Sequence, residues 1–124
     1  TRKKLFDRAI AVKTQADGVA WFEFSEICEG PRAAADYIEI ARDFHTVLIS
    51  NVPRMDRGSE DAARRFVHLV DEFYDRHVNL VCTADAGPVA LYAGERLAAA
   101  FERTASRLVE MQSTDYLALE HLGG

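Results

Sequence analysis

The sequence has few cysteines, no long apolar run and no excess of basic residues. Cys28 and Cys82 are the two cysteines among 124 residues, which is too few for a disulfide framework and favours reduced thiols in the cytosol. No apolar stretch approaches the roughly 20 residues of a membrane span, so we expect neither a transmembrane segment nor a signal peptide. A net charge of −5 without a basic run argues against nucleic acid as the main partner.

Motifs that would complete a catalytic site are also missing. No glycine is followed by lysine, so no Gly-x-x-x-x-Gly-Lys-Ser/Thr loop can wrap the phosphates of a nucleotide in backbone amides. Gly-x-Ser-x-Gly and His-Glu-x-x-His do not occur either. The four histidines lack paired ligand spacing, so we expect no metal site. The chain alone therefore carries no complete catalytic site.

The first third of the sequence predicts a β-hairpin followed by a helix. Residues 8–14 and 19–24 are rich in β-branched and aromatic side chains, and Asp17-Gly18 between them is a turn signal. A short turn over residues 25–29 follows. A helix is expected to open at Gly30-Pro31, because proline is tolerated in the first helical turn.

A βαβ unit is predicted after this helix. Residues 45–50 and 78–83 are continuous apolar runs, typical of strands that are covered on both faces. Residues 59–77 between them form a clearly amphipathic helix that Ser59 can cap. Strand, helix and strand in this order predict a right-handed parallel crossover. We therefore expect residues 1–124 to form one α/β domain: a mixed sheet with an N-terminal β-hairpin followed by a βαβ unit, with helices packed on the sheet.

Residues 94–112 predict one helix that carries arginines along the edge of its apolar face. Arg96, Arg103 and Arg107 fall on one stripe about 16 Å long at 1.5 Å per residue. Arg103 and Arg107 are four apart, where like charges repel. This lineup predicts an anion, either a carboxylate of the same chain or a phosphate. Glu110 is the nearest local partner for ion pairing, and stabilisation of a transferred phosphoryl group is the other interpretation.

Two further groups of polar residues are candidate ligand contacts. Ser50 and Asn51 end the first predicted buried strand, and Thr83 and Asp85 end the second, where open α/β sheets bind ligands. Alternatively, Asn51 and Asp85 hydrogen-bond their own turns. Arg64 and Arg65 each follow an acidic residue by four positions, which is typical of a solvated helix face, and a phosphate contact is the alternative.

Four strings in the same order carry a resemblance to a known family. They are residues 22–37 (FEFSEICEGPRAAADY), 44–53 (FHTVLISNVP), 61–75 (DAARRF and LVDEFYD) and 101–113 (FERTASRLVEMQS). Together they resemble the C-terminal third of the ZapE-type ATPases, which are P-loop, AAA+-like proteins of the bacterial division ring with mitochondrial relatives. The resemblance covers residues 8–122, nearly the whole chain.

The resemblance implies that residues 1–124 are the C-terminal fragment of a larger P-loop ATPase. The Walker A loop, the Walker B acidic pair and the first sensor would lie upstream of Thr1. It implies ATP and magnesium in the full-length protein, with none expected bound to this fragment, and ATP hydrolysis by the parent. The candidate arginine finger or sensor residues are the four arginines within the matching strings: Arg64, Arg65, Arg103 and Arg107.

The resemblance also implies partners and a place in the cell. The upstream ATPase domain of the same chain and the division protein FtsZ are the expected partners, with a homo-oligomer of the full-length protein as a further expectation. The cytoplasm, at the division site near the inner membrane, is the expected location.

Three functional hypotheses follow from the residues and the resemblance. The leading one is a domain that packs on the nucleotide-binding core and supplies arginines to the ATP site. The alternative is a non-catalytic interaction domain whose acidic surface and helix 59–77 bind a division partner. The third is a small-molecule binder that uses Asn51, Thr83 and Asp85.

Overall fold

The computed structural model describes residues 2–5, 8–11, 14–30 and 33–123. Four strands form a sheet of order β3–β4–β5–β6. They are β3 (Thr14–Ala16), β4 (Val19–Glu23), β5 (Thr46–Val52) and β6 (Asn79–Ala84). β3 pairs antiparallel with β4, while β4, β5 and β6 run parallel. The predicted α/β class, a mixed sheet that joins a hairpin to parallel strands, is confirmed.

The predicted first strand of the hairpin, residues 8–14, has the wrong bounds. Asp17 and Gly18 form the turn as predicted, with Gly18 at a φ of 73°. Glycine is required there, because an added Cβ would lie 2.3 Å from the His45 ring. However, the antiparallel partner of β4 is β3, while β2 (Arg8–Ala11) pairs with β1 (Arg2–Leu5) in a separate two-stranded sheet. The rest of the predicted strand includes residues 12–13, which lie outside the described part of the chain.

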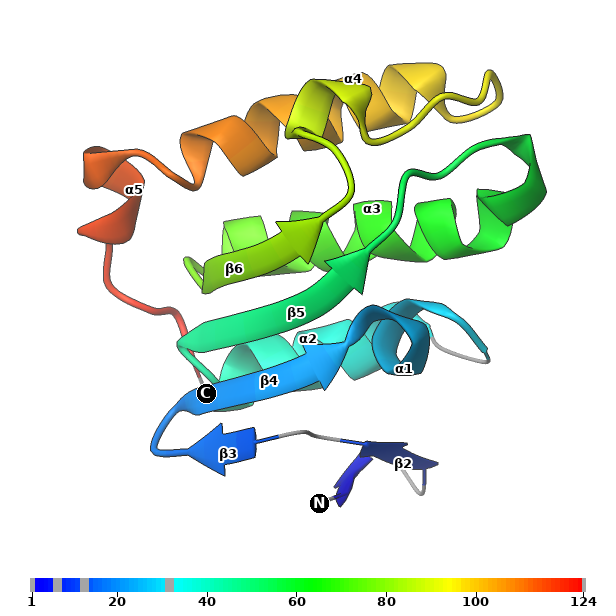
Figure 1. The fold of residues 1–124 in the computed structure, drawn as a ribbon. Coiled ribbons are helices and arrows are strands. Elements are labelled where there is room, and N and C mark those ends of the chain that lie inside the picture. The colour runs from blue at the N-terminus through cyan, green and yellow to red at the C-terminus, as the bar shows by residue number, and fades with distance from the viewer. Residues whose placement is uncertain (1, 6–7, 12–13, 31–32, 124) are drawn as a thin grey trace.

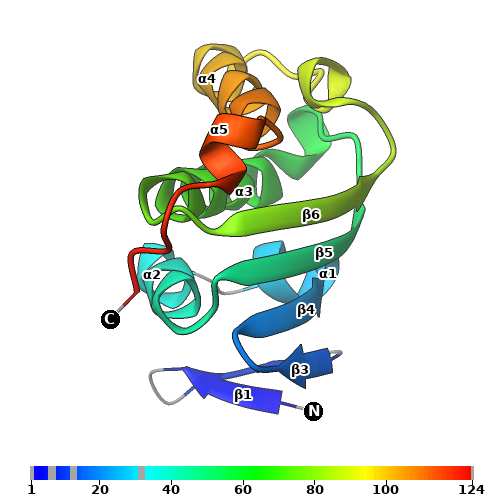
Figure 2. The same ribbon diagram turned by 90° about the vertical axis from the view of Figure 1, so that its left-hand side faces the viewer.

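Helices cover one face of the four-stranded sheet. α2 (Ala34–Asp43) and α3 (Glu60–Asp75) lie behind the strands in Figure 1 and to their left in Figure 2, whereas α1 (Phe24–Cys28) follows directly at the end of β4. α4 (Ala98–Glu110) packs against α3 beyond the β6 edge and is followed by α5 (Thr114–Leu117). Two short 3-10 helices, η1 (Arg57–Ser59) and η2 (Pro88–Ala90), lie between these elements. Among the described residues, no helix is both long and apolar enough to cross a bilayer.

Several helix boundaries differ from the prediction. Of the segment 25–29, predicted as a turn, residues 25–28 belong to α1 and Glu29 caps its C-terminal end. The helix expected at Gly30-Pro31 begins at Ala34, and residues 31–32 are outside the described part. The helix expected from residue 94 begins at Ala98, so Arg96 precedes it and does not extend the arginine stripe. The sequence period placed the helix correctly, but it could not show where the preceding loop stops.

The cap of α3 also differs from the prediction. Ser59 occupies the N-cap position but makes no side-chain cap hydrogen bond. Its hydroxyl oxygen instead accepts a hydrogen bond from the Asp56 amide at 2.9 Å. The Asp56 carboxylate accepts one from the Gly58 amide at 2.8 Å. The side-chain cap is therefore made by Asp56 at the start of η1, one turn before the position expected for α3.

The core lies between the sheet and helices α1 to α3. Alternate residues of β4 and β5 point toward the helices and are fully or almost fully buried: Ala20, Phe22, Val47 and Ile49. They meet a buried stripe of α3 that includes Phe66, Leu69, Val70 and Phe73. Burying each large apolar side chain contributes about 1.5–3 kcal/mol. Tyr37 of α2 is also buried and donates a hydrogen bond to the Ile27 carbonyl at 2.8 Å, which ties α2 to α1.

β6 is less buried than predicted. It was expected to be covered on both faces, but it ends the sheet and its Val81 side chain is 53% exposed. For the residues that the structure describes, no helix covers the face of the sheet turned away from α2 and α3 (Figures 1 and 2). An apolar run indicates a strand, but the coverage of that strand depends on elements that the run does not encode.

Two buried tyrosines predict a loss of stability at high pH. Tyr116 donates hydrogen bonds to the carbonyls of Val78 at 2.8 Å and Phe73 at 3.2 Å. Burial raises the pKa values of Tyr37 and Tyr116 well above the ordinary 10.0. The folded state therefore keeps its phenol protons while the unfolded state loses them. Stability should be complete below pH 10 and should fall as pH rises, by about 1.4 kcal/mol per unit for each such tyrosine.

Urea unfolding between pH 8 and 11 measures this effect. Tyr116→Phe should cost about 1 kcal/mol at neutral pH, because two carbonyls lose a donor. Above pH 10 the same variant should lose stability less steeply than the unmodified chain, since one titrating group is gone. An unchanged slope would show that Tyr116 titrates normally.

Candidate arginine cluster and sheet-end site

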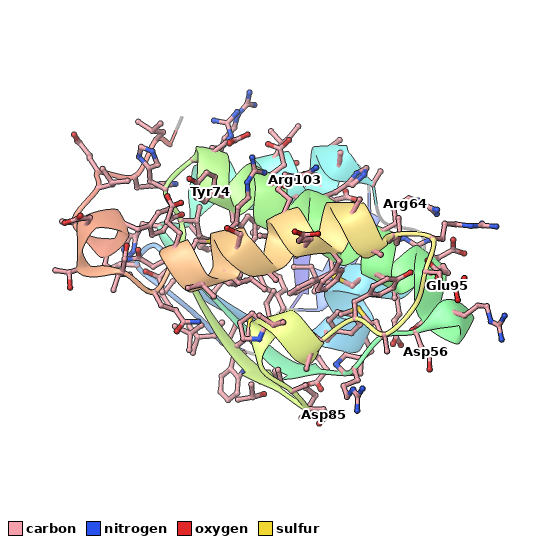
Figure 3. The ribbon with its side chains drawn as sticks, turned by 90° about the horizontal axis from the view of Figure 1, so that it is seen from above. Asp56, Arg64, Tyr74, Asp85, Glu95 and Arg103 are labelled. Atoms are coloured by element: carbon pink, nitrogen blue, oxygen red, sulfur yellow. The ribbon has the colours of Figure 1, made fainter. Side chains whose placement is uncertain are left out.

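The arginines of α4 meet a carboxylate on α3. An Arg103 Nη2 atom donates to Asp71 Oδ2 at 3.0 Å, and Arg107 Nη1 donates to Asp71 Oδ1. The Arg107 guanidinium also lies over the Tyr74 ring, with its central carbon 4.8 Å from the ring centroid. Figure 3 shows Arg103 and Tyr74 along this side of α4. In this structure the anion beside both arginines is therefore a carboxylate of the same chain.

Exposure distinguishes the two arginines. The Arg103 side chain is 50% exposed, whereas those of Arg107 and Asp71 are 27% and 26% exposed. Glu110 accepts a hydrogen bond from Tyr74 Oη at 2.6 Å, and this bond raises the Tyr74 pKa. Glu110 was the local partner expected for Arg107, but Arg107 forms its ion pair with Asp71. The cluster thus carries two cations and two carboxylates, with Arg103 at its accessible edge.

Arg64 and Arg65 do not join this cluster. Arg64 Nη1 lies 3.4 Å from Asp61 Oδ1, three residues earlier, and both side chains are exposed. Arg65 donates to the Cys28 carbonyl at 3.3 Å. Arg64 precedes Asp71 by seven residues, about 10 Å along the helix axis. Figure 3 likewise places Arg64 toward the other end of the α3–α4 pair from Tyr74.

The structure brings Asn51 and Thr83 together at the carboxyl end of the sheet. The Asn51 amide donates to Thr83 Oγ1 at 2.8 Å, and its side-chain amide donates to Glu23 Oε1 at 2.5 Å. Asn51 has a φ of 63°, in the left-handed region, where the β5–β6 register shifts. Instead of bonding only its own turn, Asn51 therefore links β5 to both neighbouring strands.

The predicted sheet-end site differs from the structure at Asp85, which makes a backbone contact, and at Glu23, which was not predicted. The Asp85 amide donates to the Val52 carbonyl at 3.0 Å, and Asp85 is exposed. In Figure 3 Asp85 lies on the opposite side of α4 from Arg103. Glu23 could not be assigned to this edge from the sequence, because it belongs there only when β4 is known to run parallel beside β5. The sheet-end residues and the arginine cluster are separate sites.

Comparison with known proteins identifies the family of this fold. Residues 1–120 match the family model described as AFG1-like ATPase. The chain belongs to the AFG1-like ATPase family. The Cell division protein ZapE of Escherichia coli strain K12 is 50% identical over 101 residues, which cover 82% of this chain and 27% of that relative. The Lactation elevated protein 1 homolog B of Danio rerio is 35% identical over 141 residues, covering 88% and 28%.

The resemblance to ZapE-type ATPases is thereby confirmed. The AFG1-like domain spans about a quarter of the length of these curated relatives. No solved structure matches it.

An apolar groove of about 510 Å³ in the AFG1-like domain lies between β6 and α4–α5. Its walls include Leu80, Cys82, Leu108 and Met111. Desolvation by these walls raises the pKa of the Cys82 thiol to about 12, so the thiol stays protonated at neutral pH. Among the residues described, no group of three or more His, Cys, Asp or Glu side chains could hold a metal ion. The groove offers apolar contact rather than chemistry.

The described residues of the AFG1-like domain do not form a triphosphate site. The glycine turn before α3 is the nearest approach to one, because amides at a helix start can bind phosphate. The Gly58 amide is already bonded to Asp56. Glu60 and Asp61 occupy the first turn of α3, where their charge would repel a phosphate. The turn before α3 therefore has no free Gly58 amide to offer to a phosphate.

The Asp71 contacts predict a stability difference between two acidic residues of α3. Asp71→Asn in the AFG1-like domain should cost about 1–2 kcal/mol, because two charge-assisted hydrogen bonds are weakened. Asp61→Asn removes one exposed pair and should cost less than about 0.5 kcal/mol. Urea unfolding followed by Trp21 fluorescence compares them. Equal losses would show that the Asp71 cluster does not hold α4 to α3.

Proposed function

We propose that this AFG1-like domain packs on the nucleotide-binding part of a larger ATPase and supplies an arginine from α4 to the ATP site. Membership of an ATPase family supports an ATP-hydrolysing parent. The observation that carries the arginine role is the arrangement at Asp71. There, two guanidinium groups stand side by side on one helix, and the Arg103 side chain is half exposed.

Arg103 is the more suitable of the two for contact with a second domain or subunit. Its side chain is half exposed where it meets Asp71, and ion pairs open to solvent are worth about 0–1 kcal/mol. Exchanging Asp71 for a phosphate would therefore cost little. Arg107 is less exposed and rests on Tyr74 as well as Asp71. We assign Arg107 the task of holding the cluster together, with direct phosphate contact as its second possible role.

The chemistry needed from such an arginine is charge stabilisation. In phosphoryl transfer, negative charge spreads over the oxygens of the transferred group, and a guanidinium placed there lowers the barrier. ATP and magnesium would be bound by the remainder of the parent. Arg64, Arg65, Asn51, Thr83 and Asp85 stay secondary candidates, because none of them belongs to the Asp71 cluster.

Substitutions in the full-length parent test the arginine role. Arg103→Ala should reduce the kcat for ATP hydrolysis at least tenfold, since arginine fingers contribute far more than that in related chemistry. Asp71→Asn is the matched control: it disrupts the same ion pairs but keeps both cations. It should change kcat less than threefold. Arg64→Ala reports on the separate exposed arginine of α3.

The pattern of these variants decides between catalysis and structure. If Asp71→Asn lowers kcat as much as Arg103→Ala, the cluster acts only by positioning α4. If none of the arginine variants changes kcat, the parent completes its ATP site without this domain. Circular dichroism of each variant establishes that the fold is retained.

A second candidate function is a non-catalytic interaction domain. A hollow of about 300 Å³ between α2 and α3 supports it, with Tyr37, Arg64, Arg65 and His68 among its lining residues. A division partner such as FtsZ, met in the cytoplasm at the division site, would dock there. Pull-down with purified FtsZ should then lose at least tenfold in affinity on His68→Glu and be unaffected by Arg103→Ala. Capture that is insensitive to His68→Glu would exclude this hollow.

A further inference from the structure

Three neighbouring strands align large apolar side chains on the uncovered face of the sheet. The register pairs Trp21 with Leu48 and Leu48 with Val81. These residues alternate with the buried, helix-facing side chains, so they lie together on the other face. Trp21 is 37% and Val81 53% exposed. The row crosses β4, β5 and β6, and the face of the sheet opposite α2 and α3 is the one turned to the viewer in Figure 1.

Among the described residues, β4, β5 and β6 carry little charge on this face. Nine residues of β4, β5 and β6 point to this side, and Glu23 is the one charged residue among them. The nine are Val19, Trp21, Glu23, Thr46, Leu48, Ser50, Asn79, Val81 and Thr83. Charged residues make up 28% of the whole sequence and are normally concentrated on the surface. Depletion of charge at the centre of an exposed patch is typical of the core of an interface.

The Trp21 ring can be covered by apolar groups at no cost to its indole N–H. Its indole N–H donates to Ser50 Oγ at 2.5 Å, so its polar atom is bonded within the sheet. Ser50 itself is only 8% exposed. A partner that covers the ring would therefore gain apolar burial without leaving the indole nitrogen unsatisfied. Tryptophan in this setting is among the residues that contribute most to interfaces.

Parallel sheets are normally covered on both faces, because their strands are built of apolar residues on both sides. Here α2 and α3 cover one side, and the described residues leave the other open. We propose that this open face, centred on Trp21, Leu48 and Val81, is the surface that docks on the remaining polypeptide of the full-length parent. The proposal deepens the proposed function, in which the domain packs on the rest of the ATPase.

The size of the face favours an attached occupant over a second copy. Three strands of five residues span on the order of 250 Å² at ordinary strand spacings. Stable complexes between separate proteins bury about 800 Å² on each partner. A segment of the same polypeptide is held at high effective concentration and needs much less contact area. The curated relatives supply such a segment, since this chain matches only 27% and 28% of their lengths.

Thiol labelling of the full-length parent tests the docking face. Val81→Cys places a thiol on it, and Val109→Cys places one on the outer side of α4. The two valines are matched, being 53% and 54% exposed in the isolated domain. Both variants are made with Cys82→Ala, so that the neighbouring native thiol does not contribute. Each labelling rate is divided by that of the same variant in denaturant and read by peptide mass spectrometry.

Position 81 should label at least tenfold more slowly in the parent than position 109. Equal rates would overturn the proposal. Protection of position 81 that disappears on dilution, in step with dissociation of a dimer seen by sedimentation, would also overturn it, because a second copy would then be the occupant. If Val81→Cys does not fold, Leu48→Cys is used in its place on the same face.

This experiment is independent of ATP turnover. A parent that hydrolyses ATP with an Arg103-dependent rate, but labels freely at position 81, would retain the proposed function and lose the docking face. A parent with protected position 81 and arginine-independent turnover would do the reverse.

Discussion

Burial of one face of the parallel sheet against α2 and α3 is the interaction on which the rest of the structure depends. Phe22 and Ile49 from the sheet meet Phe66 and Phe73 from α3, and all four are almost completely buried. At about 1.5–3 kcal/mol for each large side chain, this contact outweighs any single polar interaction in the domain. It fixes the rotation of α3 about its own axis. That rotation decides which α3 side chains are left to meet α4.

Aromatic packing holds α4 to the rest of the domain, and the arginine ion pairs add less to this attachment. Phe101 stacks between Phe66 of α3 and Tyr92 of the preceding loop, with ring centroids 6.1 Å and 5.2 Å away. Such burial anchors the helix more strongly than the ion pair between the half-exposed Arg103 and Asp71, which is worth about 1 kcal/mol or less when solvated. Arg103 can therefore exchange its partner without release of α4. A residue can hold a structural ion pair in the isolated domain and still be available to a ligand that approaches from outside.

The sequence was informative where a pattern reported directly on local geometry. The 3.6-residue period of α3 located its buried stripe, including Phe66, Leu69, Val70 and Phe73, and the apolar runs located β5 and β6. It was less informative where a partner decides the outcome. Residues 8–11 have the composition of a strand, yet nothing in them distinguishes pairing with β1 from pairing with β4. The exposure of Val81 depends on the position of β6 in the sheet order, which no residue of β6 encodes.

The candidate site shows the same distinction. The spacing of Arg103 and Arg107 predicted an anion, but it could not choose between Asp71 and a phosphate, because a guanidinium binds both in the same way. Asp71 carries no signal of its own, since it lies on the flank of α3 beside the buried Leu69 and Val70. Only the packing of α4 across α3 brings it to the arginines. Glu23 entered the sheet-end group for a similar reason.

Three surfaces of the domain differ in chemistry and lie on different parts of the fold. The Asp71 cluster lies on α3 and α4, the Asn51 and Thr83 contact lies at the carboxyl end of the strands, and the row from Trp21 to Val81 lies on the open face of the sheet. Among the described residues, none of these surfaces combines backbone amides arranged to bind a phosphate with a group able to transfer a proton. Their separation is understandable if the domain works as one wall of a larger site. The apolar face would then fix the position of the domain. An arginine on another face would neutralise the phosphate charge that the rest of the protein leaves uncompensated.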